Sequence, residues 1–378
     1  MCPSTTLCFF TLRIAAAFCI ALPASSPSQC CCKNASIIYL DNPAGVGFST
    51  IPPGHQAQHS DAGGAPDFQQ FLLVLFRDIF PSLADHPIHI AGEPYGGHYV
   101  PVYTHHILRS RKYNSAVAFR GNIESIILVN AMIDEAAPSI GEYDLLCAGQ
   151  NPGILNSTAC DAIEKYLPEC RKLTNFCYVT DGKEVCAEEV QGRRRPYNVN
   201  LPCDEYPLCF DPKLGNFALF LNQAWVKTRL GFSPYFDFHG VNLTLNSDYF
   251  NHGDVARTAR RELISILDDA RTDGCAEFPD NSSSSPGIRV LVMNGNDDFI
   301  QASWRATPWT TWPPGKTAKT GIAINQYYHE GDGFWKQSHD GQLVFVGING
   351  AGHAAPGDNP EVASAVLAKW LNGWEAQD

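Results

Sequence analysis

The sequence has 378 residues, of which 44% are hydrophobic and 17% are charged, and its formal net charge is −12. The length allows one large α/β domain or two ordinary domains, and the composition is that of a soluble globular protein. The negative charge argues against nucleic acid and against an anionic membrane surface as partners, because both repel an acidic protein.

Residues 1–29 differ in composition from the rest of the chain. A mostly apolar run extends from Leu7 to Leu22, interrupted by Arg13, and ends among small residues. This pattern predicts a cleavable signal peptide, and the run is too short to span a membrane. Translated non-coding sequence at a mistaken start is the alternative. No convincing strand pattern is found in residues 1–33.

Short apolar runs and amphipathic segments alternate in the next part of the chain. Strands are predicted at residues 36–40, 88–91 and 124–130, and helices at residues 66–80 and 99–110. Pro66 suits the first turn of its helix. Strands that alternate with helices indicate a parallel sheet covered on both faces.

A sharp turn follows the strand at residues 88–91. The sequence Gly92-Glu-Pro-Tyr-Gly96 has the spacing of a nucleophile elbow, in which a serine stands on a strained turn between a strand and a helix. Pro94 occupies the position of that serine, and it has no hydroxyl or thiol that could attack a carbonyl carbon. Proline also holds φ near about −65°, whereas a strained elbow needs φ > 0, so the turn is expected to be reshaped.

The strand–helix pattern breaks down between residues 133 and 251, where only short helical segments such as residues 217–230 are expected. Seven cysteines lie between residues 147 and 209. This crowding predicts a disulfide-stapled insertion in an oxidising compartment. A metal cluster is the alternative, disfavoured because there is no Cys-x-x-Cys pair, and no metal or cofactor is predicted. The run Arg193-Arg-Arg195 is interpreted as an exposed loop rather than as a processing site.

Four Asn-x-Ser/Thr sequons predict a glycoprotein, and they begin at Asn34, Asn156, Asn242 and Asn281. The remainder of the chain returns to the pattern of a sheet with helices. A helix is predicted at residues 256–269, strands at 287–294, 321–329 and 341–347, and a closing helix at 360–374. No linker separates two independent cores.

Four segments resemble motifs of the serine carboxypeptidase family. Residues 34–49 resemble the strand and loop before the elbow, and residues 92–99 resemble the signature Gly-Glu-Ser-Tyr-Ala-Gly-His-Tyr. Residues 294–300 and 350–356 resemble the aspartate and histidine motifs. The order of elbow, aspartate and histidine is that of α/β-hydrolases.

The resemblance implies an α/β-hydrolase fold, with a mixed, mostly parallel sheet flanked by helices. It assigns residues 34–132 and 252–378 to the core, without the first strands, and residues 133–251 to a disulfide-rich cap insertion. It leaves residues 1–29 as a signal peptide or a leader foreign to the family.

The resemblance also implies a role for each matched position. His353 would be the histidine that moves the proton and Asp298 the aspartate that orients it, with Asp297 as the nearest rival. Glu93 would bind the terminal carboxylate of a peptide substrate, and this requires a shared proton. The Tyr95 amide would be an oxyanion donor.

Two departures from the family pattern predict impaired or absent catalysis. Pro94 removes the nucleophile, and residues 1–33 hold no counterpart of the family's Asn-Gly-Gly-Pro-Gly segment, which supplies a second oxyanion amide. One alternative is a non-catalytic protein that binds peptide or protein C-termini. Another is a truncated or mis-spliced product without a stable fold, with its junction at Cys30-Cys-Cys32. The expected location is the secretory pathway, either extracellular or vacuolar/lysosomal.

Overall fold

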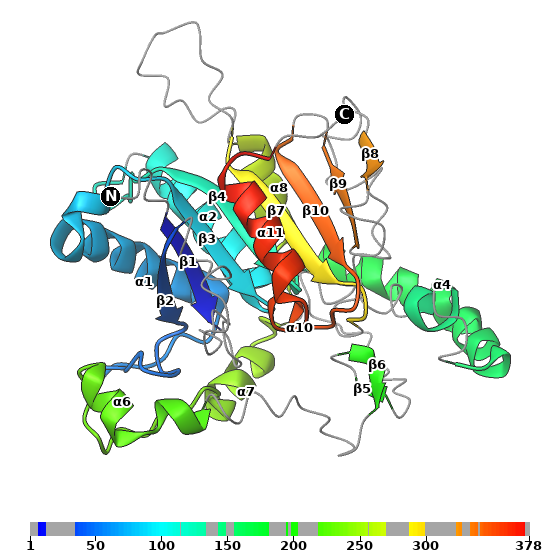
Figure 1. Cartoon of the computed structure of the whole chain (residues 1–378), viewed down its shortest axis with the longest axis horizontal. Helices are drawn as coiled ribbons and strands as arrows, with labels where there is room; N and C mark the ends of the chain where they lie inside the picture. Colours follow the sequence, from blue (N-terminus) through cyan, green and yellow to red (C-terminus); the bar gives the residue numbers. More distant parts are fainter. Residues whose placement is uncertain are drawn as a thin grey trace, which may run out of the picture.

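The computed structural model describes a large part of the chain: residues 7–12, 35–113, 115–133, 143–148, 155–180, 194–195, 198–202, 218–255, 257–269, 287–298, 323–326, 333–338 and 341–374. These residues form an eight-stranded sheet in the order β2-β1-β3-β4-β7-β10-β9-β8 (Figure 1). The strands are β1 (Leu7–Leu12), β2 (Ser36–Asp41), β3 (Ile88–Glu93), β4 (Ile123–Val129), β7 (Arg289–Gly295), β8 (Ala323–Gln326), β9 (Gly333–Gln337) and β10 (Leu343–Ile348).

The sheet is mixed and mostly parallel, as predicted. The six strands β2, β1, β3, β4, β7 and β10, which are neighbours in this order, all run parallel. Strand β9 runs antiparallel to β10, and β8 runs antiparallel to β9. All six residues of β10 are buried, because a central parallel strand is covered on both faces. A separate two-stranded ladder joins β5 (Arg194–Arg195) to β6 (Asn198–Pro202).

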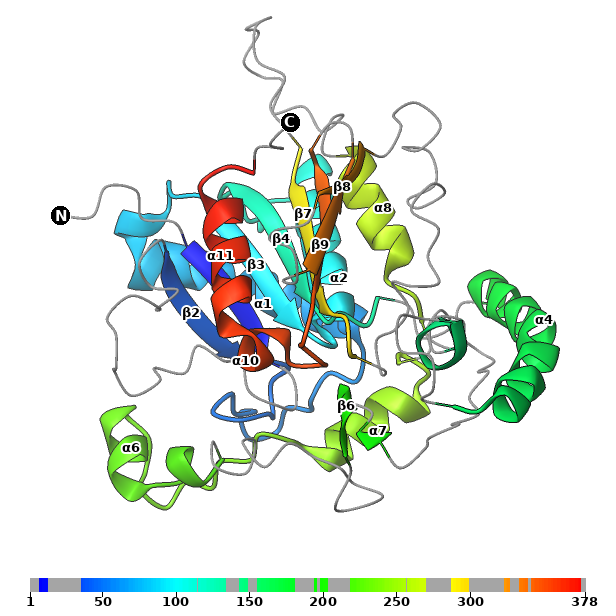
Figure 2. The ribbon, with the colours of Figure 1, turned by 45° about the vertical axis from the view of Figure 1, so that its right-hand side comes forward.

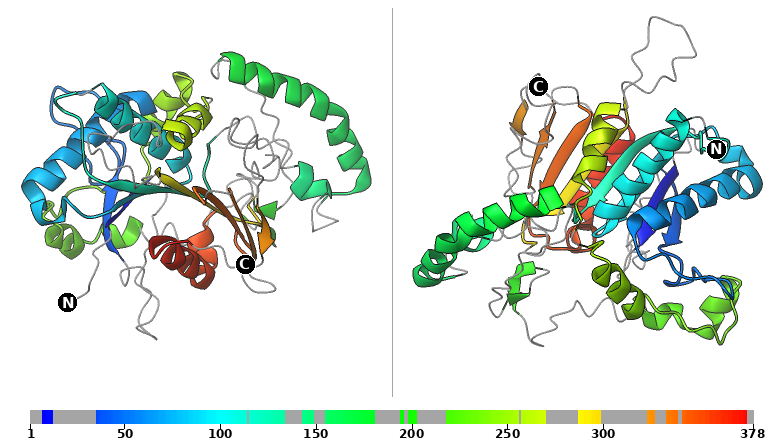
Figure 3. Two further views of the ribbon diagram at one scale, coloured as in Figure 1. Left: turned by 90° about the horizontal axis from the view of Figure 1, so that it is seen from above. Right: turned by 180° about the vertical axis from the view of Figure 1, so that it is seen from behind.

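Helices cover both faces of the sheet (Figure 3). One face carries α1 (Asp61–Val74), α2 (Gly96–Lys112) and α8 (Arg260–Asp269), and the other carries α10 (Ala355–Asp358) and α11 (Pro360–Leu371). Alternate residues of each strand enter the two resulting cores. Phe345, for example, packs in the cluster of α1, α2 and α8, whereas Val344 and Val346 pack in the cluster that contains Trp370 of α11.

Helix α1 begins five residues before the predicted start at Pro66. Ser60 caps it, since its side-chain oxygen accepts a hydrogen bond from the amide of Gly63 at 3.1 Å. Pro66 therefore lies inside the helix rather than in its first turn. After Val74 the chain continues as a π-helical turn, Leu75–Ile79, and a 3₁₀ turn, Pro81–Leu83.

The segment of residues 133–251, predicted as a cap, differs from its prediction in two helices. The expectation of short helices only is wrong, because α4 (Ser157–Thr180) has 24 residues and lies apart from the sheet (Figure 2). The helix predicted over residues 217–230 is interrupted at Gln223, which has an extended conformation, so that α6 covers Ala224–Arg229.

The expected use of disulfides in this segment is supported by one pair of described residues, although the sequence did not predict which cysteines pair. The disulfide joins Cys147, in the π-helical turn Asp144–Ala148, to Cys160 of α4. A further helix described in this segment is α7 (Leu243–Asn251). Within the described part of the chain, no helix combines the length and the apolar character needed to cross a membrane.

Strand β1 corrects the expectation that residues 1–33 contain no strand. It lies between β2 and β3 and pairs with both, so that Phe9 is opposite Ile38 on one side and Ile90 on the other. A strand of a parallel sheet that is covered on both faces has a continuous apolar sequence. The same pattern is typical of a signal peptide. Removing that segment would leave β2 without its partner among the described strands and β3 paired with β4 alone.

Candidate active site

The elbow lies between Glu93, the last residue of β3, and Gly96, the first residue of α2. The carbonyl oxygen of Pro94 accepts hydrogen bonds from the amides of Gly97, at 3.0 Å, and Met132, at 2.8 Å. A Cβ atom on Gly97 would lie 2.3 Å from the carbonyl oxygen of Met132, so this glycine permits the close approach. The turn after β3 is thus fastened to the segment after β4.

No residue of the elbow, Gly92–Gly96, has a positive φ. Among the described residues, Asn130 is the only non-glycine residue with a positive φ, which is 43°. Pro94 therefore does not adopt the φ > 0 of a strained elbow, as the proline ring predicts.

His353 and Asp298 come together at the ends of β10 and β7. Nδ1 of His353 lies 3.0 Å from Oδ2 and 3.2 Å from Oδ1 of Asp298, whose side chain is fully buried. Burial lowers the pKa of His353, but the charge and hydrogen bond of Asp298 outweigh burial, so the net pKa is raised. Asp297, the rival, donates its backbone amide to the carbonyl oxygen of Ala351 at 2.9 Å.

Asn130 is a positioning residue that the sequence analysis did not single out. Its Nδ2 donates to Oδ2 of Asp298 at 2.9 Å and to the carbonyl oxygen of Gly352 at 3.1 Å. Its Oδ1 accepts from the amide of Ala355 at 3.3 Å. One side chain at the end of β4 therefore holds both the aspartate and the loop that carries His353. A polar residue that tolerates φ > 0, at the carboxyl end of a predicted strand, was the available signal.

Glu93 shares the electrostatic environment of this pair. Burial raises its pKa to about 8; the charge of His353 opposes this shift, and the charges of Asp298 and Asp358 add to it. Glu93 is therefore a neutral hydrogen-bond donor at pH values well below 8. A neutral carboxylic acid can donate a hydrogen bond from its O–H group to a ligand carboxylate.

Tyr95 connects the elbow to Asp254, which follows α7. Its hydroxyl group donates to Oδ2 of Asp254 at 3.2 Å, and the same oxygen accepts from the amide of Asp61 at 3.1 Å. Burial and the neighbouring Asp61 raise the pKa of Asp254 to about 7. The side chain of Asp61 in turn contacts His98, whose Nδ1 lies 3.0 Å from Oδ2 of Asp61. Through this network the first turn of α2 depends on a residue that follows α7.

The predicted site residues Glu93, Pro94, Tyr95, Asp298 and His353 all lie at the carboxyl ends of β3, β7 and β10 or directly after them. In open α/β sheets this edge carries the active site. The sheet order, the elbow and the Asp–His pair define an α/β-hydrolase fold. Of the four sequons, Asn156 and Asn242 are described, whereas Asn34 and Asn281 lie outside the described residues.

Comparisons with known proteins identify the family. The family model for serine carboxypeptidases matches residues 31–373. Carboxypeptidase Y homolog A of Sclerotinia sclerotiorum is 32% identical over 364 residues, which cover 90% of this chain and 60% of that protein. The homolog of Aspergillus clavatus is 27% identical over 363 residues, which cover 90% of this chain and 61% of that protein. The chain belongs to the serine carboxypeptidase family.

A solved structure supports the fold. The prohormone-processing carboxypeptidase Kex1(Δ)p from Saccharomyces cerevisiae superposes with a TM-score of 0.65 at 16% identity, and the match covers 97% of this chain and 83% of that chain. The chain spans only about 60% of the length of the curated relatives that it matches.

Proposed function

We propose that this chain is a catalytically impaired or inactive serine carboxypeptidase, whose family reaction releases C-terminal amino acids from peptides through an acyl-enzyme. The observation that carries the proposal is the contrast within one site. Asp298 and His353 lie within hydrogen-bond distance, whereas Pro94 occupies the elbow. Histidine and aspartate activate a serine hydroxyl, and without that oxygen there is no atom to acylate.

The first prediction concerns the nucleophile. We expect no covalent labelling of the native protein by a fluorophosphonate probe, because the probe reacts with an activated serine. We expect Pro94→Ser to restore only weak hydrolysis of a blocked dipeptide, since one missing oxyanion donor typically lowers turnover by ~10²–10³. Pro94→Ala is the matched control and should be inert.

Either of two results would contradict this proposal. Stoichiometric labelling of the native chain would reveal another nucleophile, and robust hydrolysis by Pro94→Ser would reveal another oxyanion donor. The hypothesis of a product without a stable fold is tested separately, because it requires that the purified chain show no cooperative thermal transition.

A second candidate function is non-catalytic binding of peptide C-termini, and the raised pKa of Glu93 favours it. We expect the affinity for a peptide with a free C-terminus to fall about tenfold as the pH rises through about 8, because ionised Glu93 repels the ligand carboxylate. In Glu93→Gln, whose amide stays neutral, the affinity should not change with pH over this range. Isothermal titration on both sides of pH 8 makes the comparison.

The control ligand is the same peptide with a C-terminal amide, whose binding should not depend on the state of Glu93. An identical pH dependence in Glu93→Gln would assign the titration to another group and remove this argument for peptide binding. We also propose a location in the secretory pathway, supported by the disulfide between Cys147 and Cys160 and by the sequons.

A further inference from the structure

The two described sequons, at Asn156 and Asn242, use their side chains differently. Each asparagine stands before a helix and caps it through Oδ1. Asn156 accepts from the amide of Ala159 at 2.9 Å before α4, and Asn242 accepts from the amide of Leu245 at 3.1 Å before α7. A glycan is attached to Nδ2, so the surroundings of that atom decide whether the folded protein accommodates the sugar.

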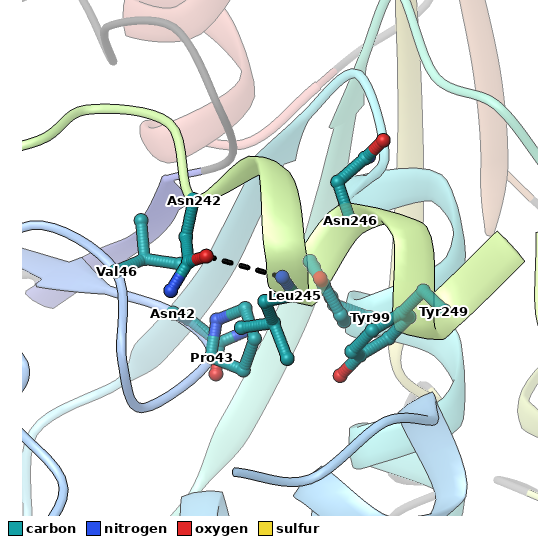
Figure 4. A pocket seen from close by; sticks show the side chains of 8 residues that line it. All are labelled: Asn42, Pro43, Val46, Tyr99, Asn242, Leu245, Asn246 and Tyr249. Atoms are coloured by element: carbon teal, nitrogen blue, oxygen red, sulfur yellow. Dashed lines mark hydrogen bonds between the residues drawn. The ribbon is translucent and has the colours of Figure 1, made fainter.

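Nδ2 of Asn242 already donates a hydrogen bond within the protein. It donates to the carbonyl oxygen of Gly45 at 2.9 Å, and a Cβ atom on Gly45 would lie 3.8 Å from it. Asn242 also lines a small pocket with Asn42, Pro43 and Val46 of the loop after β2 (Figure 4). The amide therefore joins the start of α7 to this loop, across 197 positions of sequence.

Asn156 presents the opposite situation. The residue is exposed, and so are the next two residues of its sequon, Ser157 and Thr158. Its one side-chain hydrogen bond within the described part of the chain is the cap to Ala159, which uses Oδ1 and not Nδ2. A sugar on Nδ2 preserves this cap, because Oδ1 remains an acceptor.

We infer that, of the two described sequons, Asn156 accepts a glycan in the folded protein and that Asn242 is an unmodified clamp between α7 and the loop of residues 42–46. A sugar on Nδ2 of Asn242 would take the place of the contact with Gly45. The helix start would then separate from the loop. The inference rests on the proposed secretory route, and the test below supplies that route by design.

Glycopeptide mapping tests the inference. The full chain is translated into microsomes behind a cleavable heterologous signal sequence, and the folded, protease-resistant fraction is deglycosylated in heavy-oxygen water and analysed by mass spectrometry. We expect the isotope label at Asn156 and none at Asn242. Label at Asn242, or its absence at Asn156, overturns the inference. Failure of the secretory proposal would show differently, as free thiols at Cys147 and Cys160 in the chain purified from its own cells.

Paired substitutions separate the sequon from the clamp. Thr158→Ala and Thr244→Ala destroy the sequons and keep both asparagines. We expect the first to remove the mass of one glycan and the second to leave the mass unchanged. In unglycosylated protein, Asn242→Ala should lower the melting temperature by about 2–4 °C, because a cap and a loop contact are lost, whereas Thr244→Ala should not. Equal melting temperatures for these two variants would refute the clamp.

Discussion

Replacing Gly295 with alanine is expected to destabilise the protein by about 3 kcal/mol and to separate His353 from Asp298. A Cβ atom at this position would lie 2.2 Å from the carbonyl oxygen of Gly352 and 2.3 Å from that of Ala351. Both oxygens belong to the main chain of the loop that carries His353, so no side-chain rotation can relieve the overlap. The loop must move as a unit. Chemical denaturation measures the loss of stability.

The pKa of His353, followed by NMR, reports the separation directly. Asp298 raises this pKa and burial lowers it, so a histidine that leaves the aspartate but stays buried must titrate at lower pH than in the native protein. Gly357→Ala is the matched control, because its added Cβ would meet no atom closer than 3.9 Å. An unchanged pKa of His353 in Gly295→Ala would show that the loop absorbs the overlap elsewhere.

The strands that carry the site could be predicted from sequence because they are buried on both faces. Such strands have unbroken apolar sequences, and this pattern predicts β3, β4, β7 and β10. Each run ends close to a short polar motif. The roles of Asp298 and His353 come from the family resemblance, and the structure brings the two residues together because parallel strands place their carboxyl ends along one edge.

Asn130 escaped prediction because its role is visible only in three dimensions. In the sequence it is the last residue of an apolar run, whereas in the structure it holds two loops that lie more than 160 positions away. Its φ of 43° costs roughly 1–2 kcal/mol relative to an ordinary backbone. The strain that a hydrolase elbow would hold is absent at Pro94, and strain remains on the side of the Asp–His pair.

Strand β1 was missed for a different reason. Its apolar residues fit two incompatible roles, a signal peptide or a central strand, and composition cannot choose between them. The choice depends on whether β2 and β3 need a partner, which is a property of the sheet. At a spacing of about 4.8 Å per strand, β2 and β3 lie about 10 Å apart across β1.

Deleting residues 1–29 is therefore expected to abolish cooperative unfolding. Six residues of β1 pair with β2 and the same six pair with β3, and both ladders would be lost. Closing the gap would move β2 by about 5 Å. That movement would break the hydrogen bond between Asn42, directly after β2, and the Tyr103 hydroxyl in the α2 core, now 3.2 Å long. A typical domain is stable by only about 5–15 kcal/mol, so the loss of two six-residue ladders is expected to unfold it.

Circular dichroism during heating of the full chain and of residues 30–378 decides the matter. Phe9→Pro should have nearly the same effect as the deletion, because proline removes a ladder hydrogen bond from a strand paired on both sides, whereas Phe9→Val, which keeps the backbone amide, should have a much smaller effect. N-terminal sequencing of the mature protein should find β1 still attached. If residues 30–378 instead melt cooperatively at the temperature of the full chain, the sheet does not depend on β1, and the apolar run is free to serve as a signal peptide.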